Sequence, residues 1–376
     1  MMKMQKQNAR LGFTLVELMV SMAVGLIVMA AMASLFRTGM QSTLLVTQRA
    51  ETQQNMRAAV DLLAKDISMA GAGLPSGGIQ LPTGAGSSVS KFGCDQSGTC
   101  HVVNHTYPNT NHMYGIIPGF SNGVEGGAVI PAAPAPAVNS SITVAYVDYN
   151  FPLNEYNMYF TSSTSGVNVT LTVNPSYAAT PPPAINAAGG IQEGDLIMVA
   201  GGGITAVGDV TNITSSAATP GSPGTMTFAN GDPLNINQDA AASGNLKSIA
   251  AALGTGSPAT AYRLYVVTYY INVPGANQTP RLMRQVNGLP ATVSPAPVAD
   301  DIINLQFAYD VYNSTTDALD ANQANPLGAA ESPNNIQKVN LLVMGQSITN
   351  DGNKSQNMYL ATDVSARNMA FRNRYK

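Results

Sequence analysis

The sequence predicts an α+β protein in which one long N-terminal helix is followed by a body of antiparallel strands and long loops. An almost unbroken apolar run from Phe13 to Phe36 leads into an amphipathic segment, and no proline occurs before Pro75. Beyond that point, short runs rich in β-branched and aromatic residues alternate with Gly- and Pro-rich segments. Only 10 % of the residues are charged, whereas 35 are Gly and 23 are Pro, which favours a strand-and-loop body over a coiled coil.

The first residues predict a leader followed by a membrane-spanning helix. Residues 1–12, MMKMQKQNARLG, hold Lys3, Lys6 and Arg10 and no acid, and basic residues beside an apolar run stay cytoplasmic. Residues 13–36 form a run of 24 residues. At ~1.5 Å per residue this run spans roughly 36 Å, enough for a ~30 Å hydrocarbon core. The run is longer than the apolar core of a secretory signal, so we expect a single membrane anchor with the body exported.

A plain anchor does not explain Glu17. A charged side chain inside a bilayer costs about 3 kcal/mol on insertion scales and is normally paired. The apolar run contains no Lys or Arg that could pair with Glu17. A free amine from another subunit could serve as the counter-ion, provided that the chain is cut so that an amine lies at the right depth.

Residues 37–70 predict an amphipathic continuation of the helix. Its apolar positions recur at spacings of four and three, which gives one stripe that we expect to pack on a sheet: Met56, Val60, Leu63, Ile67 and Ala70. Gly39 is the weakest helical position, and GAGLPSGG at 71–78 is expected to end the helix.

Residues 71–376 predict an exported β-rich domain. Runs typical of strands occupy 141–149, 167–173, 195–200, 262–273, 281–286, 302–312 and 339–344. The runs 262–273 and 281–286 flank PGANQTP and predict a hairpin. Segments rich in Pro, Gly, Ala and Ser predict long surface insertions at 118–140, 175–190 and 201–261.

The only two cysteines, Cys94 and Cys100, lie close together in the chain. In an exported protein such a pair predicts a disulfide that closes a small loop. His101, His105 and His112 follow directly, so the pattern C-x5-C-H-x3-H-x6-H also offers enough ligands for zinc. The cysteine spacing is wider than in most zinc sites, and an oxidising exterior favours the disulfide. We expect no metal and no cofactor.

No motif predicts catalysis. The sequence has no G-x-S-x-G, and its three histidines fall in one loop-like stretch. The acidic stretch 310–325 has oxygen ligands at short spacing but lacks the D-x-D-x-D-G pattern of calcium loops, so a solvated acidic loop is expected. The net charge of −3 does not suggest a broad nucleic-acid surface. We expect a protein that is not an enzyme.

The segment GFTLVELM at 12–19 resembles the processing signature of type IV prepilins. The resemblance implies that a prepilin peptidase cuts between Gly12 and Phe13 and that the new Phe13 amine is methylated. It also implies that Glu17 pairs with the N-terminal amine of a neighbouring subunit during assembly, which would supply the missing counter-ion. The implied fold is pilin-like, with the helix spine packed on an antiparallel sheet.

Weaker similarity extends into the body. RAAVDLLAKDISMAGAG (57–73), GDLIMVA (194–200) and TDVSARNMAFRNRY (362–375) resemble minor pilins of the PilW type, and the N-terminus is shared with PulJ/GspJ-like pseudopilins. The resemblance implies an inner-membrane protein with a periplasmic domain that primes or caps a type IV pilus. Its partners would be other minor pilins, the major pilin and a tip adhesin, with no nucleic acid required. A pseudopilin of type II secretion and a tip-located adhesion or DNA-binding module are the alternatives.

Overall fold

The structure is a computed structural model, and it describes residues 12–107, 111–130, 138–151, 153–161, 167–173, 190–213, 224–254, 257–275, 278–327, 332–347 and 356–369. The chain divides into two compact units, and the boundary along the N-terminal helix falls between Glu51 and Thr52. The first unit contains the exposed start of the helix, and the second contains the rest of the helix and all the sheets.

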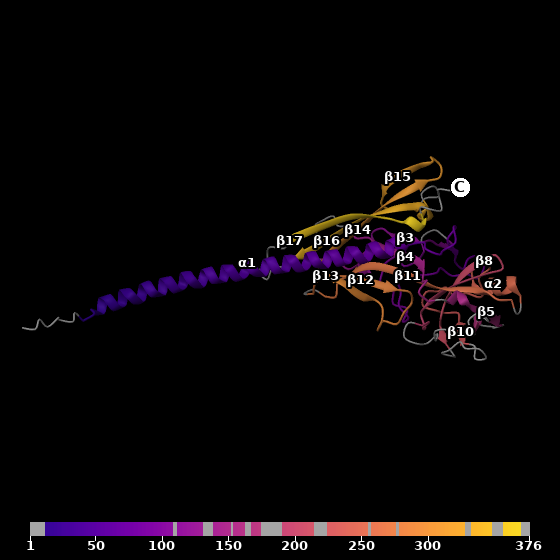
Figure 1. Ribbon diagram of the computed structural model, residues 1–376, viewed down its shortest axis with the longest axis horizontal. Coiled ribbons are helices and arrows are strands. Elements are labelled where there is room, and N and C mark those ends of the chain that lie inside the picture. The colour runs from indigo at the N-terminus through magenta and orange to yellow at the C-terminus, as the bar shows by residue number, and fades with distance from the viewer. Residues whose placement is uncertain are drawn as a thin grey trace, which may run out of the picture. The chain divides into compact units, whose positions relative to one another are not determined.

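The helix α1 (Leu15–Met69) has 55 residues and is drawn in Figure 1 as a continuous coil. This confirms the long helix predicted from the apolar run and the amphipathic segment, and Gly39 does not interrupt it. The chain leaves the helix through Gly71, whose φ of +77° is in the left-handed region that favours glycine. A Cβ at Gly71 would also lie 2.8 Å from Cγ of Met369, so the turn has no room for a side chain.

Strands dominate the rest of the second unit, and all pairs between named strands are antiparallel. The elements are β1 (Ile79–Gln80), β2 (His112–Met113), β3 (Ile116–Gly119), η1 (Glu125–Gly127), β4 (Ser141–Val147), η2 (Leu153–Glu155), β5 (Tyr156–Thr161), β6 (Val167–Val173), β7 (Leu196–Gly201), β8 (Ile204–Asp209), β9 (Asn212–Ile213), β10 (Gly224–Phe228), α2 (Leu246–Leu253), β11 (Thr260–Asn272), β12 (Arg281–Val286), β13 (Ala296–Asp300), β14 (Ile302–Asn313), β15 (Ala318–Gln323), η4 (Pro333–Asn335), β16 (Ile336–Ser347) and β17 (Gln356–Ser365).

These strands form several sheets rather than the single sheet that we expected. A seven-stranded sheet contains five strands in the order β13-β12-β11-β4-β3. Its other two strands are β7, which pairs with the first part of β11, and β8, which pairs with β7. A four-stranded sheet has the order β15-β14-β16-β17, a second has the order β5-β6-β10-β9, and β1 pairs with β2. The predicted hairpin is confirmed, because β11 pairs with β12 from Val267↔Val286 to Asn272↔Arg281. The α+β fold class is confirmed, with the helix packed against antiparallel sheets.

The second half of α1 lies between the seven-stranded sheet and the β14–β16 sheet. One apolar core joins the predicted helix stripe to residues of β4, β11, β14 and β16, and the five stripe residues are all buried. Figure 1 shows α1 with β14, β16 and β17 on one side and β11, β12 and β13 on the other. Gly345 of β16 approaches the helix so closely that a Cβ there would lie 2.8 Å from Sδ of Met56.

The seven-stranded sheet is buried on both faces, because side chains alternate along each strand. On β4, Ile142 and Val144 join the core beneath α1, whereas Ala145 and Val147 join a core formed with residues 74–117. The cysteine pair is therefore on the face of this sheet opposite to α1.

The expectation that 201–261 is a surface insertion is wrong. This stretch contains β8, β10 and α2, and its buried side chains Phe228, Leu246 and Ile249 form a core with β5, β6 and β7. The strand β10 in this stretch pairs with β6, which comes much earlier in the chain, and local composition does not reveal such a partner. The predicted insertion at 118–140 includes η1 and lies partly outside the described residues, and almost all of 175–190 lies outside them.

Candidate functional site

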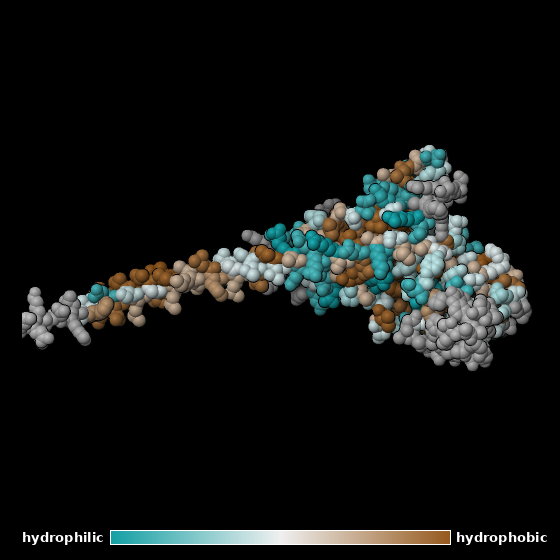
Figure 2. All heavy atoms as spheres, in the orientation of Figure 1, coloured by the Kyte–Doolittle hydropathy of each residue, from teal (hydrophilic) through white to brown (hydrophobic). Residues whose placement is uncertain are grey.

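The start of α1 is an exposed apolar surface. Every residue from Gly12 to Met40 is exposed, including Phe13 (81 %) and Leu15 (76 %), and Figure 2 shows this start of the helix largely in the brown of hydrophobic residues. By length and composition α1 is suited to cross a membrane, since its most apolar window has a mean hydropathy of 2.3. An apolar face of this extent is stable only when lipid or other apolar helices cover it.

Glu17 lies at the first turn of this helix and forms a reciprocal pair with Thr14. The Glu17 N–H donates to Oγ1 of Thr14 (3.3 Å), and Oε2 of Glu17 accepts from the Thr14 N–H (3.4 Å). This is the capping-box arrangement, which satisfies two backbone N–H groups that the helix cannot satisfy itself. Within the described residues Glu17 forms no ion pair, so its carboxylate has local hydrogen bonds but no cation.

Gly12 and Phe13 are the expected cleavage residues, and both are exposed and non-helical. A Cβ placed on Gly12 would meet nothing within 4 Å, so packing within this chain does not require glycine there. A requirement for Gly12 would therefore have to come from an enzyme that reads this position. The leader before it, residues 1–11, lies outside the described residues.

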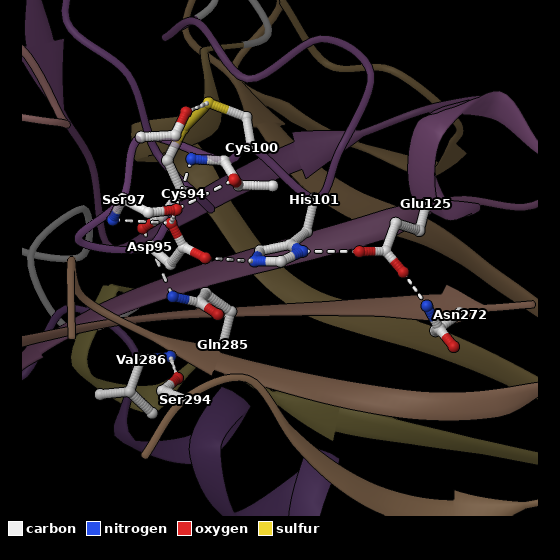
Figure 3. Close-up of polar contacts among 12 residues, drawn as sticks. Cys94, Asp95, Ser97, Cys100, His101, Glu125, Asn272, Gln285, Val286 and Ser294 are labelled. Atoms are coloured by element: carbon white, nitrogen blue, oxygen red, sulfur yellow. Dashed lines mark hydrogen bonds and ion pairs between the residues drawn. A yellow bond between two sulfur atoms is a disulfide. The ribbon is translucent and has the colours of Figure 1, made fainter. Parts of the chain in front are cut away.

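Cys94 and Cys100 form a disulfide that closes a loop at the edge of the core behind the seven-stranded sheet. The loop is also held by Asp95, whose Oδ1 accepts hydrogen bonds from the Ser97 N–H (2.9 Å), the Ser97 hydroxyl (2.6 Å) and the Thr99 N–H (3.0 Å). Figure 3 shows Asp95 and Ser97 in contact beside the disulfide. A carboxylate that accepts several hydrogen bonds in this way fixes the conformation of a tight turn.

His101, the residue after the second cysteine, is buried between two carboxylates. Its Nδ1 lies 2.6 Å from Oε1 of Glu125, its Nε2 lies 3.7 Å from Oδ2 of Asp95, and its ring stacks on Tyr270 with centroids 5.4 Å apart. Glu125 also accepts a hydrogen bond from Asn272 of β11 (Figure 3). The cluster thus ties the disulfide loop and η1 to the central sheet.

The three histidines do not converge on a zinc site. His105 Nδ1 lies 3.3 Å from the carbonyl oxygen of Val102, and His112 is in β2, stacked near Tyr114. In the part of the chain that the structure describes, no group of three or more His, Cys, Asp or Glu side chains is arranged to hold a metal ion. Both cysteine sulfurs are in the disulfide, so neither is a thiolate ligand.

The acidic stretch 310–325 is a hairpin of β14 and β15 rather than a solvated loop. Asp310 is buried, and its carboxylate accepts from the Asn322 N–H (3.0 Å) and from Asn340 (2.9 Å) and pairs with Lys338 (3.0 Å). Burial alone raises the pKa of Asp310, but these three partners outweigh burial and lower it. The Asp310 carboxylate is therefore already satisfied by protein groups.

Sequence reasoning missed the most concentrated polar contact of the helix, Asp66. This buried carboxylate accepts from the hydroxyls of Tyr146 (3.1 Å) and Tyr269 (2.6 Å) and from Nε of Arg284 (2.8 Å). The three donors come from β4, β11 and β12, so one helix residue is bonded to three adjacent strands of the sheet. The predicted stripe was apolar, but Asp66 lies three residues after Leu63 and four before Ala70, at the edge of that stripe. The helical spacing therefore indicates that Asp66 faces the sheet, although it does not identify its three partners.

Sequence analysis also did not predict a group of three buried carboxylates. Asp195, Asp209 and Asp232 are each nearly inaccessible to solvent. Burial raises the pKa of Asp195 to about 6, and burial with its acidic neighbours raises the pKa of Asp209 well above the usual range. These groups stabilise the fold best when they are protonated.

The start of the chain matches a known family. Residues 7–33 match the prokaryotic N-terminal methylation motif. Comparisons with curated proteins and with solved structures found no match. The residues that the structure describes include one helix suited by length and composition to cross a membrane, together with an α+β body. With the methylation motif, these features support a type IV pilin-like or pseudopilin-like protein. Proteins of that type are structural rather than enzymatic, and the motif is typical of chains that prepilin peptidase processes and that associate with other pilins.

Proposed function

We propose that this protein is a minor pilin that takes part in type IV pilus assembly as part of a minor-pilin complex. Prepilin peptidase cleaves between Gly12 and Phe13, the Phe13 amine is methylated, and residues 13–36 anchor the chain in the inner membrane. The body then lies in the periplasm and is carried to the pilus tip. The observation that carries the proposal is the exposed apolar helix with one acid at its first turn, within a matched methylation motif.

In this mechanism Glu17 recognises the next subunit. Its carboxylate is bonded only to Thr14 within the described residues, and a bilayer makes an uncompensated carboxylate unfavourable. A methylated N-terminal amine of a neighbouring pilin is a cation at the matching depth. The attraction between the two charges offsets part of the desolvation penalty of both, and the pair aligns the two helices.

The test replaces Glu17 with Gln, which keeps its size and hydrogen-bonding capacity but removes the charge. We expect Glu17→Gln to insert and to be cleaved normally but to leave cells without pili, as seen by electron microscopy and shear preparation. Glu51→Gln, an equally exposed acid on the same helix, is the matched control and should support normal piliation. Normal piliation with Glu17→Gln would count decisively against the proposed role.

Processing is tested separately by the intact mass and N-terminal sequence of the membrane-extracted protein, measured with and without reductant. A chain that begins at methylated Phe13, and that gains two protons on reduction of Cys94–Cys100, agrees with the proposal. A chain that retains its leader in cells with active prepilin peptidase contradicts it.

The same motif also fits a pseudopilin of a type II secretion system, because it concerns the N-terminus alone. Deleting the gene distinguishes the two functions: loss of surface pili supports the minor pilin, whereas loss of exoprotein release with intact pili supports the pseudopilin. A deletion of 201–261 would not isolate an adhesive role, because that stretch builds a core with β5, β6 and β7.

A further inference from the structure

A groove of about 310 Å³ lies in the second unit on the side of the disulfide core. It is lined by neutral side chains of one loop and by two residues that come later in the chain: Leu81, Pro82, Thr83, Ser87, Ser88, Val89, Ser90, Tyr107 and Asn111. Its volume is at the lower end of the ~300–1,000 Å³ typical of small-molecule sites. None of these lining residues carries a charge.

The loop that forms one wall, residues 81–90, is held at both ends. The Leu81 N–H donates to the Asn111 carbonyl (2.7 Å), and the Tyr107 N–H donates to the Ser90 carbonyl (3.4 Å). The middle of the loop is clamped by Gln238, whose Oε1 accepts from the Ser88 N–H (2.6 Å) and whose Nε2 donates to the Ser88 carbonyl (2.9 Å).

The loop also packs tightly against residues 240–243. Gly86 has a φ of +80°, and a Cβ there would lie 2.4 Å from the carbonyl oxygen of Ala240. Thr83 pairs with Ser243 through two backbone hydrogen bonds of 3.0 and 3.3 Å. The groove is therefore formed before any ligand arrives, and binding would order little of the chain.

The groove offers hydroxyl groups beside apolar and aromatic surface. Within the described residues, the hydroxyls of Thr83 and Ser88 have no hydrogen-bond partner, so they are free to donate and accept. The Ser87 and Ser90 hydroxyls donate to backbone carbonyls (2.7 and 3.0 Å) and keep their lone pairs. The ring of Tyr107 adds an aromatic wall.

We propose that this groove binds a neutral sugar unit of a glycan. A pyranose ring presents hydroxyls at its edge and apolar C–H groups on its faces, which matches neutral hydroxyls set beside Leu81, Val89 and Tyr107. An anionic group would lack a cation, because none of the described lining residues is Lys or Arg, and a cationic ligand would lack a carboxylate, because none of them is Asp or Glu. A neutral sugar, bound through hydrogen bonds between its hydroxyls and those of the groove, therefore fits better than a phosphate, a sialic acid or an amine.

The experiment uses the full mature chain in lipid nanodiscs, since glycoside detergents would compete for the groove. The protein in nanodiscs is screened against an array of neutral, sialylated and sulfated glycans. Hits are measured by calorimetry with the corresponding neutral disaccharide. Ser88→Arg places a long side chain across the groove from an exposed position, and we expect binding to weaken at least tenfold. Ser68→Arg, the same change at an exposed position on α1, is the matched control and should bind as the wild type does.

Thr83→Val tests the hydroxyl without adding bulk, and it should weaken binding several-fold. The proposal is overturned if no neutral glycan binds at millimolar concentration. It is also overturned if binding is unchanged in both groove variants, or if sialylated or sulfated glycans bind best. Circular dichroism of each variant establishes that a loss of binding occurs in a folded protein. These outcomes do not depend on whether the chain primes a pilus.

Discussion

The substitution Asp66→Asn tests how the helix is attached to the sheet. Asp66 has a side chain only 4 % exposed, and it accepts hydrogen bonds from Tyr146, Tyr269 and Arg284. Asparagine keeps the shape of the side chain but leaves Arg284 without its counter-ion and presents an NH₂ group to donors. Removing one member of a buried pair costs about 3–5 kcal/mol.

The expected loss is at the low end of that range, because the Arg284 side chain is 26 % exposed and recovers part of its hydration. We therefore expect Asp66→Asn to lower the free energy of unfolding by about 3 kcal/mol. The measurement is chemical denaturation of the full chain followed by circular dichroism. Asp61→Asn is the matched control, since Asp61 is exposed on the same helix, and its effect should stay within ~0.5 kcal/mol.

A double-mutant cycle assigns the loss to the pair. If Asp66 acts through Arg284, then Asp66→Asn combined with Arg284→Gln should cost clearly less than the sum of the two single changes, with a coupling of roughly 0.5–3 kcal/mol. An Asp66→Asn protein as stable as the Asp61→Asn control would refute the reasoning. If the two single losses of stability simply add in the double variant, the loss caused by Asp66→Asn would come from the tyrosine contacts instead of from Arg284.

Three further predictions concern the rest of the molecule. Burial raises the pKa of Asp195 to about 6, so the folded state binds this proton more tightly than the unfolded chain does. The unfolding free energy should therefore fall by up to about 3 kcal/mol as pH rises from about 4 to 6. The variant Asp195→Asn should lack that part of the pH dependence, as measured by denaturation at a series of pH values. Replacing both Cys94 and Cys100 by Ala should lower stability by about 2 kcal/mol, and adding reductant to the wild type should reproduce the loss; equal midpoints would contradict a stabilising role. Thr14→Val removes the hydroxyl that accepts from the Glu17 N–H, and hydrogen exchange at that amide should accelerate about fivefold, corresponding to about 1 kcal/mol of capping.

Local patterns sufficed where an element is defined by its own residues. The run 167–173 coincides with β6, and the helix stripe from Met56 to Ala70 is buried as its spacing requires. The close cysteine pair could be predicted for the same reason, because both partners and the loop between them lie within a few residues. In each case the information is in a short window of sequence.

Elements that depend on distant partners were missed. The segment 201–261 was assigned to the surface because it is rich in Gly, Ala and Ser, yet β10 is paired with β6, which comes much earlier in the chain, and α2 joins the same core. A short strand with few large apolar residues, such as β10, is stable only within a sheet whose other strands come from elsewhere in the chain. The strand β17 was also missed, although its partner β16 is its neighbour in sequence, because its side chains alternate in exposure without a buried position.

The Asp66 cluster shows why part of the candidate site could not be predicted. Its partners Tyr146, Tyr269 and Arg284 lie 80, 203 and 218 positions away in the sequence. Before the strands are paired, nothing in the sequence places three donors around one carboxylate. The acid at position 17, by contrast, is conspicuous because it interrupts an apolar run.

The Asp66 cluster also explains how a repetitive helix face keeps one position on the sheet. The apolar stripe repeats every three or four residues, so apolar packing alone distinguishes poorly between positions one helical turn apart. A slip of one turn, ~5.4 Å, would carry Asp66 away from all three of its donors. It would leave a buried carboxylate unpaired, at a cost of several kcal/mol. Replacing Asp66 by Leu should therefore remove this discrimination, at a stability cost at least as large as that of Asp66→Asn because Arg284 and both tyrosines lose their acceptor. A disulfide-trapping series between α1 and β16 in the folded variant should then detect cross-links in more than one register. A single register in Asp66→Leu would mean that the shape of the apolar core, including the close approach of Gly345 to Met56, suffices to position the helix.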